Sequence, residues 1–355
     1  MKKILAINPG STSTKLAYFE DDTPILEQSL TFPKPEGQGR VHVLDEYEAR
    51  MESITAFLEE NHISLADIDL FVSRGGAPGR VEYGAYEIDK TVVQLLCFSD
   101  APTYHASNLA PILAYSLAQR AGGKPAIFYD AVSADQASPL AHMSGIPGVA
   151  RRVGCHNLNT RMVGREAAAQ LGKAYEESRL VIAHLGGGIS VSAHNHGVID
   201  DSVMCDEGPM GPQRAGRVSF LQMMQMCYVE KRTMQEMQRI TDAGGLLSYF
   251  HVDTMIALEE KIDAGDREAE FLYQVMAYQI CKEIGAIVLW NRNKSGDEVF
   301  KVYRREYKKR FAWIKAKRID PAVFYEWSAR AREKKDACER GELTLEEFQA
   351  WLKLS

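Results

Sequence analysis

Two glycine-rich turns, each directly after an apolar, strand-like run, constrain the fold of this chain more than any other feature. The first lies near the start of the chain in ILAINPGSTSTKLAYF, and the second lies in VIAHLGGGISVSAH. The two segments align residue by residue, with Gly10 on Gly187 and Ser13 on Ser190. Such internal similarity predicts a duplicated unit, and therefore two related domains that follow one another along the chain.

Glycine and hydroxyl residues at these turns suit phosphate chemistry. Backbone N–H groups approach a phosphoryl group closely only where side chains are absent or small, while hydroxyls add donors and a lysine adds positive charge. An ordinary β-hairpin turn explains the same residues, and neither turn has the P-loop or the dinucleotide pattern. We expect phosphate or nucleotide binding by Gly10, Ser11, Thr12, Ser13 and Lys15 in the first turn, and by His184, Gly186, Gly187, Gly188 and Ser190 in the second.

Bulk composition narrows the class of protein. With 355 residues, of which 45% are hydrophobic and 25% charged, the chain is long enough for two domains with sizeable cores. It has no apolar run of membrane-spanning length, and a strand begins within three residues of the N-terminus, which leaves no room for a signal peptide. Six cysteines without CxxC pairs favour reduced thiols over zinc ligands. These features predict a cytoplasmic protein that does not enter a membrane.

The last part of the chain differs from the rest. Residues 291–355 carry 17 basic and 11 acidic residues, whereas the whole chain has a net charge of -6, and all four tryptophans lie from Trp290 onward. Apolar residues recur there at helical spacing, and Asp320-Pro321 is typical of a helix start. We expect a basic, Trp-rich helical tail of different origin. Its acids dilute the positive charge, which disfavours nucleic-acid binding.

The pattern of apolar residues predicts the order of elements. In the first half, strands are expected at 3–8, 15–19, 25–32, 68–72 and 126–129, with helices at 44–61 and 105–121. In the second half, strands are expected at 180–184, 189–193 and 198–203, after a helix at 157–171 and before several helices between 216 and 286. We expect two α/β domains across a cleft, at 1–150 and 151–290.

Seven motifs in collinear order carry a family resemblance: NPGSTSTKLAYF, SRGG, YHASNLAPILAY, FYDAV, GCHNLNTR, AHLGGGISVSAH and DEGPMGPQRAG. Over residues 1–286 the chain resembles butyrate kinase, a relative of acetate kinase in the actin-like ATPase superfamily. The resemblance implies two actin-like, ribonuclease H-like domains. It also implies phosphate transfer between ATP and a short-chain carboxylate with Mg²⁺, giving ADP and an acyl phosphate. The residues of these motifs resemble the butyrate type more than the acetate type, which favours butyrate or a branched acid as substrate.

The same resemblance implies roles for individual residues. Arg74 would position the carboxylate or the phosphate, Arg214 would stabilise the moving phosphate, and His156 would hydrogen-bond to it. Asp130 would be a positioning or acid–base group, although an aspartate at a strand end can also cap the next segment. On the substrate side the resemblance implies His105, and near Mg²⁺ and phosphate it implies Asn8.

The resemblance stops near residue 286. Butyrate kinases continue through a strand whose glycine pair grips adenosine, and later place a glutamate near the metal. Here IVLW at 287–290 could stand in for that strand, but Asn291, Arg292 and Asn293 follow it. We expect an incomplete second domain with reduced or absent activity. The alternative is a non-catalytic fused or frame-changed product that keeps the phosphate turns, and the family commonly forms homo-oligomers.

Overall fold

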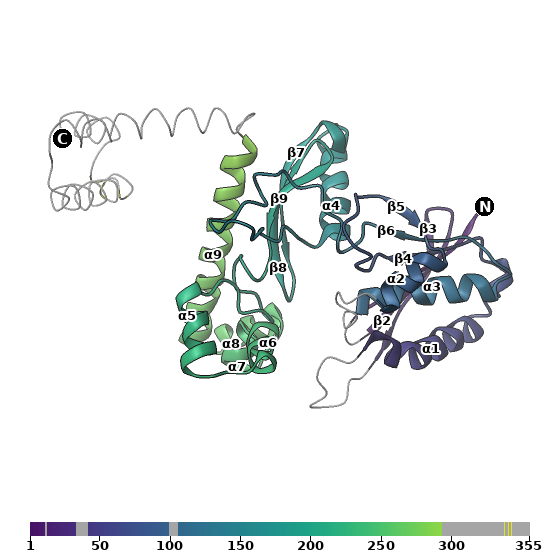
Figure 1. Ribbon diagram of the computed structural model, residues 1–355, viewed down its shortest axis with the longest axis horizontal. Coiled ribbons are helices and arrows are strands. Elements are labelled where there is room, and N and C mark those ends of the chain that lie inside the picture. The colour runs from purple at the N-terminus through teal and green to yellow at the C-terminus, as the bar shows by residue number, and fades with distance from the viewer. Residues whose placement is uncertain are drawn as a thin grey trace. The chain divides into compact units, whose positions relative to one another are not determined.

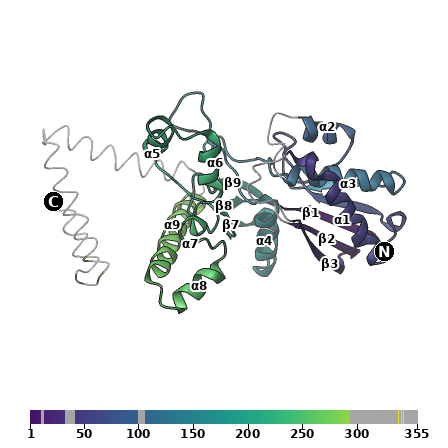
Figure 2. The ribbon, with the colours of Figure 1, turned by 90° about the horizontal axis from the view of Figure 1, so that it is seen from below.

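The computed structural model of the chain describes residues 1–10, 13–32, 42–98 and 106–292, and three single residues at 337, 340 and 342. Residues 1–292 form one compact unit, which Figures 1 and 2 show. The predictions for Ser11, Thr12 and His105, and nearly all of those for the tail, lie outside the described residues.

The first half is built on a six-stranded sheet in the order β3-β2-β1-β4-β6-β5. Its strands are β1 (Lys3–Pro9), β2 (Ser13–Glu20), β3 (Thr23–Thr31), β4 (Leu70–Arg74), β5 (Ala85–Glu87) and β6 (Ala126–Tyr129). The first three strands are antiparallel, and β4 and β6 continue the sheet in the direction parallel to β1. Apolar side chains alternate along β1, so that Leu5 and Ile7 face the core.

One face of this sheet is covered by helices. They are α1 (Tyr47–Glu60) and α3 (Leu109–Arg120), with α2 (Lys90–Phe98) beside α3. Phe57 of α1 and Leu113 of α3 are buried in the same cluster as Phe71 of β4. The two predicted helices are confirmed, but each begins after a short 3-10 turn, at Val43–Glu46 and at Ala106–Asn108. The strand β5 and the helix α2 were not predicted.

The second half has a three-stranded antiparallel sheet in the order β7-β8-β9. The strands are β7 (Arg179–Leu185), β8 (Ile189–Asn195) and β9 (Val198–Val203), and α4 (Asn157–Gln170) packs on β7. All three strands confirm the prediction. The helices that follow are α5 (Phe220–Met224), α6 (Met234–Asp242), α7 (Leu246–Phe250), α8 (Met255–Asp263) and α9 (Arg267–Arg292). None of the helices among the described residues has the length and apolar character needed to cross a membrane.

The long helix α9 packs against this sheet, as Figures 1 and 2 show. Residues 287–290, the sequence IVLW, lie within this helix, so the interpretation of IVLW as a strand is wrong. The reason is the spacing of apolar residues. Ile284 and Ile287 are one turn apart and both pack against Val191 and Ala193 of β8.

The two sheets differ at the strand that precedes each glycine turn. In the first sheet, β1 has neighbours on both sides, β2 and β4. In the second sheet, β7 pairs with β8 alone among the described residues. The described part of the second half therefore has no counterpart of the parallel strands β4 and β6.

Candidate active site

Both glycine turns join neighbouring antiparallel strands, β1 to β2 and β7 to β8. Counted from the strand ends, the first residue of each turn is Gly10 and Gly186, one position away from the alignment of Gly10 with Gly187. By the same count Thr14 corresponds to Ser190. Both of these hydroxyl residues are buried, and each is hydrogen-bonded to a side chain from outside its hairpin.

The first turn is held by a buried guanidinium. Arg50 of α1 is fully buried and donates to Gly10 O (2.8 Å), Ser13 O (3.2 Å) and Thr14 Oγ1 (2.7 Å). Its Nε and Nη2 also donate to Glu46 Oε2, at 2.9 and 2.7 Å. These five bonds match the five N–H donors of an arginine. Arg50 therefore fixes the turn from the core side.

The opposite side of the first hairpin faces outward. Asn8 and Lys15 are cross-strand partners in the β1–β2 ladder, and both are exposed. The turn between them closes with a bond from Gly10 N–H to Ser13 O at 2.7 Å. An amide and an ammonium group thus lie side by side next to the turn, where an anionic ligand and its metal could reach them.

The second turn is closely surrounded by side chains. A Cβ atom at Gly186 would lie 2.7 Å from His184 Nε2, and one at Gly187 would lie 2.8 Å from the side chain of Gln213. A Cβ atom at Gly188 would lie 3.5 Å from Cγ of Arg214. Gln213 also donates its backbone N–H to Gly187 O at 2.8 Å. The run of three glycines lets these side chains come close to the backbone of the turn.

Two histidines stack beside this turn. The rings of His156 and His184 are 3.8 Å apart between centroids and 16° from parallel. His156 Nδ1 is 2.9 Å from Ser190 Oγ, and His184 Nδ1 is 2.8 Å from Asn159 Oδ1. Each ring is therefore oriented through its Nδ1 atom by a different partner.

Two arginines contribute to the electrostatics of this pair. Burial lowers the pKa of His156 to about 4, and the positive charges of His184, Arg74 and Arg214 act in the same direction. Burial also lowers the pKa of His184. At neutral pH both imidazoles are uncharged. The structure thus brings together Arg74, His156, His184 and Arg214, four of the residues singled out from sequence.

The SRGG motif places Arg74 at the end of β4. A Cβ atom at Gly75 would lie 2.5 Å from Cα of Ala131, and one at Gly76 would lie 2.6 Å from Asn108 Oδ1. Both glycines are needed for backbone packing behind Arg74. Arg214 is anchored by its own backbone neighbourhood, since Nη1 donates to Gln213 O and Asp242 O, each at 2.9 Å.

Asp130 lies in a buried ion pair. Its Oδ2 accepts from Arg161 Nε at 3.0 Å, its Oδ1 accepts from Gly84 N–H at 2.9 Å, and its side chain has no exposed surface. Burial raises the pKa of Asp130, and the pairing with Arg161 offsets only part of that shift. This geometry orients Arg161 and the surrounding backbone.

Sequence reasoning missed several residues that hold the site: Arg50, Asn159, Arg161 and Gln213. Glu46 and Arg50 have the four-residue spacing of an ordinary surface ion pair on a helix, which hides the burial of Arg50. Arg161 lies on the same helix α4 as Asn159, within the CHNLNTR motif. Its position in that motif was the available signal.

The acidic residues near the second turn are not gathered into a metal centre. Arg151 pairs with Glu207 at 2.8 Å and with Asp201 at 3.6 Å. In the part of the chain that the structure describes, no group of three or more histidine, cysteine, aspartate or glutamate side chains could hold a metal ion.

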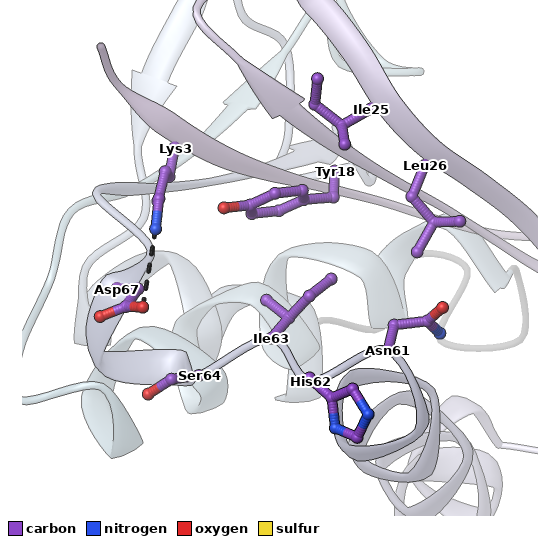
Figure 3. A pocket seen from close by; sticks show the side chains of 9 residues that line it. All are labelled: Lys3, Tyr18, Ile25, Leu26, Asn61, His62, Ile63, Ser64 and Asp67. Carbon is purple, nitrogen blue, oxygen red and sulfur yellow. Dashed lines mark ion pairs between the residues drawn. The ribbon is translucent and has the colours of Figure 1, made fainter.

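In the described part of the chain, two cavities among others have no arginine in their walls. Figure 3 shows one of about 370 Å³ on the first half, where Lys3 and Asp67 form an ion pair at 3.6 Å, and it contains no predicted site residue. The other, of about 360 Å³, adjoins the second turn and is mostly apolar. Its walls include Leu185, Gly186, Ile189, Met255, Tyr273, Met276 and Ile280.

Comparison with known proteins shows what this chain is similar to. Residues 140–294 match the profile of the acetokinase family. This match covers less than half of the chain. Several solved structures share the fold over most of the chain. Acetate kinase from Porphyromonas gingivalis superposes with a TM-score of 0.66 at 21% identity, over 82% of this chain and 81% of that one.

Two further structures agree with this fold. A propionate kinase from Francisella tularensis subsp. tularensis SCHU S4 has a TM-score of 0.65 at 18% identity, covering 82% of this chain and 81% of its own. Acetate kinase from Entamoeba histolytica has a TM-score of 0.60 at 20% identity, covering 81% and 79%. The prediction of an actin-like α/β fold is confirmed. The match to the acetokinase profile covers the second glycine turn.

Proposed function

We propose that this protein is a carboxylate kinase that transfers a phosphoryl group between ATP and a short-chain carboxylic acid. The observation that carries the proposal is the convergence of Arg74, Arg214 and His156 next to the glycine turn 186–188. The acetokinase match over residues 140–294 supports the same chemistry. The acid that we propose is butyrate or a branched relative, since the sequence motifs of both halves resemble those of butyrate kinases.

The side chains of the site suit this reaction. A phosphoryl group that passes between two oxygens carries negative charge on its equatorial oxygens and needs cations and fixed dipoles around it. Arg74 and Arg214 supply the cations, and neutral His156 supplies a hydrogen bond. Asp130 has both oxygens engaged and no exposed surface, so we assign it to positioning through Arg161 and not to proton transfer.

The turns suit the phosphates of ATP. The second turn offers backbone N–H groups at glycines, which have no side chains, and it has two arginines near it. When bound with the nucleotide, Mg²⁺ neutralises phosphate oxygens. Asn8 and Lys15 would face that end of the nucleotide. One amide does not make a resident metal site, so we infer that Mg²⁺ enters with ATP.

The test is hydroxamate formation by the purified full chain with ATP, Mg²⁺ and acetate, propionate, butyrate or isobutyrate in turn. We expect the highest kcat/KM for butyrate or isobutyrate. One methylene changes binding by only ~1–3 kcal/mol, so neighbouring acids will overlap. Arg74→Gln and Arg214→Gln should each lower kcat/KM by about 100- to 1,000-fold. Arg120→Gln, on the exposed end of α3, is the matched control and should leave it unchanged.

Each outcome separates one part of the proposal. The highest kcat/KM on acetate would contradict the choice of acid and keep the kinase. ATP binding measured by calorimetry without turnover on any acid would support the alternative, a non-catalytic product that keeps its phosphate turns. Absence of both binding and turnover would contradict the proposal as a whole.

A further inference from the structure

The two stacked histidines have different hydrogen-bond partners at Nδ1. Asn159 faces His184, and Ser190 faces His156. We propose that Asn159 is a positioning residue that holds His184 as the tautomer protonated at Nδ1, so that the stacked pair presents a donor at His156 and an acceptor at His184. The consequence for catalysis rests on the proposed kinase function, whereas the tautomers do not.

The tautomer of His184 follows from the chemistry of its partner. Asn159 presents its carbonyl oxygen Oδ1 to His184 Nδ1 at 2.8 Å. A carbonyl oxygen only accepts hydrogen bonds, so Nδ1 must carry the proton. Because the ring is neutral near pH 7, its Nε2 atom then has a free lone pair. A Cβ at Gly186 would lie 2.7 Å from that Nε2 atom, so the lone pair lies at the first glycine of the turn.

The tautomer of His156 follows from the satisfaction of a buried hydroxyl. Ser190 is fully buried, and its Oγ accepts the backbone N–H of His156 at 3.4 Å. Within the described residues, the acceptor for its hydroxyl hydrogen is His156 Nδ1, at 2.9 Å. A buried hydroxyl without an acceptor is costly, so Ser190 donates to Nδ1. His156 therefore carries its proton at Nε2.

The two Nε2 atoms lie toward opposite ends of one short turn. His184 Nε2 lies against Gly186, and His156 Nε2 would be 4.0 Å from a Cβ at Gly188. The N–H of His156 can donate to a phosphoryl oxygen, whereas the lone pair of His184 repels one. Neutral His184 instead accepts from a group that carries hydrogen, such as a water bound to Mg²⁺. This polarity sets the direction in which a phosphate chain lies along the turn.

The charged and titratable groups around the pair are consistent with two neutral rings. A charge on His184, like those of Arg74 and Arg214, disfavours protonation of His156. Burial disfavours protonation of His184. Asn159 brings no charge of its own. A carboxylate at position 159 would keep the acceptor and add a negative charge, which gives a conservative variant for the test.

The first test measures the tautomers by two-bond ¹H–¹⁵N spectra of histidine-labelled full chain at pH 7.5. His184→Gln and His156→Gln assign the two signals. We expect His184 as the Nδ1–H form and His156 as the Nε2–H form. Asn159→Leu should move His184 toward the Nε2–H form, and Asn159→Asp should keep the Nδ1–H form. His184 in the Nε2–H form in the unaltered protein, or unchanged in Asn159→Leu, would overturn the proposal.

The second test measures hydroxamate kinetics of the same variants. We expect Asn159→Leu to raise KM for ATP about 3- to 10-fold with a smaller change in kcat. Asn159→Asp should have a KM closer to that of the unaltered protein at pH 7.5. Gln170→Leu makes the same change of an exposed amide on the same helix and should have no effect. An unchanged KM in Asn159→Leu would overturn the positioning role. Tautomers as expected in a protein without turnover would contradict the kinase proposal and support the tautomer assignment.

Discussion

The two glycine turns have the same strand context and are held in opposite ways. In the first, Thr14 accepts from Arg50, a cation buried below the hairpin whose five donors are all used. In the second, the corresponding Ser190 contacts His156, a neutral ring stacked on His184. The repeated sequence pattern thus specifies a turn and a buried hydroxyl. It does not specify what supports them.

Because the two turns are supported differently, substitutions at them should have different consequences. Arg50 and Glu46 form a buried ion pair that exists only while the first half is folded. A change at this pair therefore lowers the free energy of unfolding. The two histidines are half-buried and lie beside the two arginines. A change at the second turn therefore alters the arrangement of polar groups that would contact a ligand. We therefore expect changes at the first support to unfold the protein, and changes at the second to impair its reaction.

The largest effect is expected for Arg50→Met. The substitution removes the Arg50 guanidinium from the buried Glu46 carboxylate and removes donors from three oxygens of the first hairpin. Removal of one partner from a buried ion pair costs about 3–5 kcal/mol, and we expect that loss in the free energy of unfolding. Denaturant unfolding followed by circular dichroism measures it.

The control for Arg50→Met is Arg120→Met, the same change at an exposed position of α3. It should alter the free energy of unfolding by less than about 0.5 kcal/mol. The double variant Glu46→Gln with Arg50→Met should be less destabilised than the sum of the single changes, because no charge is left buried. A loss of under about 1 kcal/mol for Arg50→Met would contradict the role of this arginine as the support of the turn.

Gly186→Ala tests the second turn by geometry. The new Cβ would lie 2.7 Å from His184 Nε2, so the ring has to shift from its place in the stack with His156. Misplacement of a catalytic group by about 1 Å costs on the order of 100-fold in rate, and we expect kcat/KM to fall by that factor. Stability should change by less than about 1 kcal/mol, because the ring can move toward solvent. Normal kinetics together with an undisturbed histidine stack would contradict this account.

Acid should weaken the protein through the second turn. The pKa of His156 is about 4 when folded and 6.5 when unfolded, so the unfolded chain binds a proton first. Stability from this group is complete well above pH 6.5 and is lost as pH falls through 6.5 toward 4, by about 3 kcal/mol. In His156→Gln the free energy of unfolding should decline less over that range. Parallel curves for the two proteins would show that His156 does not carry this dependence.

The strands and turns could be predicted because their signals are local. Alternating apolar residues and glycine turns placed all three antiparallel strands of each half. The residue count at the turns was shifted by one, since Gly10 corresponds to Gly186 in the strand pairing. The sequence alignment matched residue types, whereas the equivalence of the two hairpins is defined by the hydrogen-bonded pairing of their strands.

The supports of the site could not be predicted because they depend on burial. Glu46 and Arg50 resemble a solvent-exposed helical pair until α1 packs on the first hairpin. Nothing in the sequence around Asp130 indicated that Arg161, 31 residues later, would donate a hydrogen bond to its carboxylate. The family resemblance allows IVLW to stand in for a strand, but its spacing relative to Ile284 continues the helix. In each case a tertiary contact decided between local alternatives.

The smallest effect on stability, and the sharpest contrast between the turns, is expected for Gly10→Ala. A Cβ there would meet Ser13 O at 3.5 Å, an ordinary van der Waals contact, so we expect a change below about 0.5 kcal/mol in the free energy of unfolding. A ligand that approaches the turn would still meet the new methyl group. KM for ATP should therefore rise while stability holds, and an unchanged KM would mean that no phosphate comes close to Gly10. In that case only the second turn would bind the nucleotide, and the first would serve as the hairpin that Arg50 holds in place.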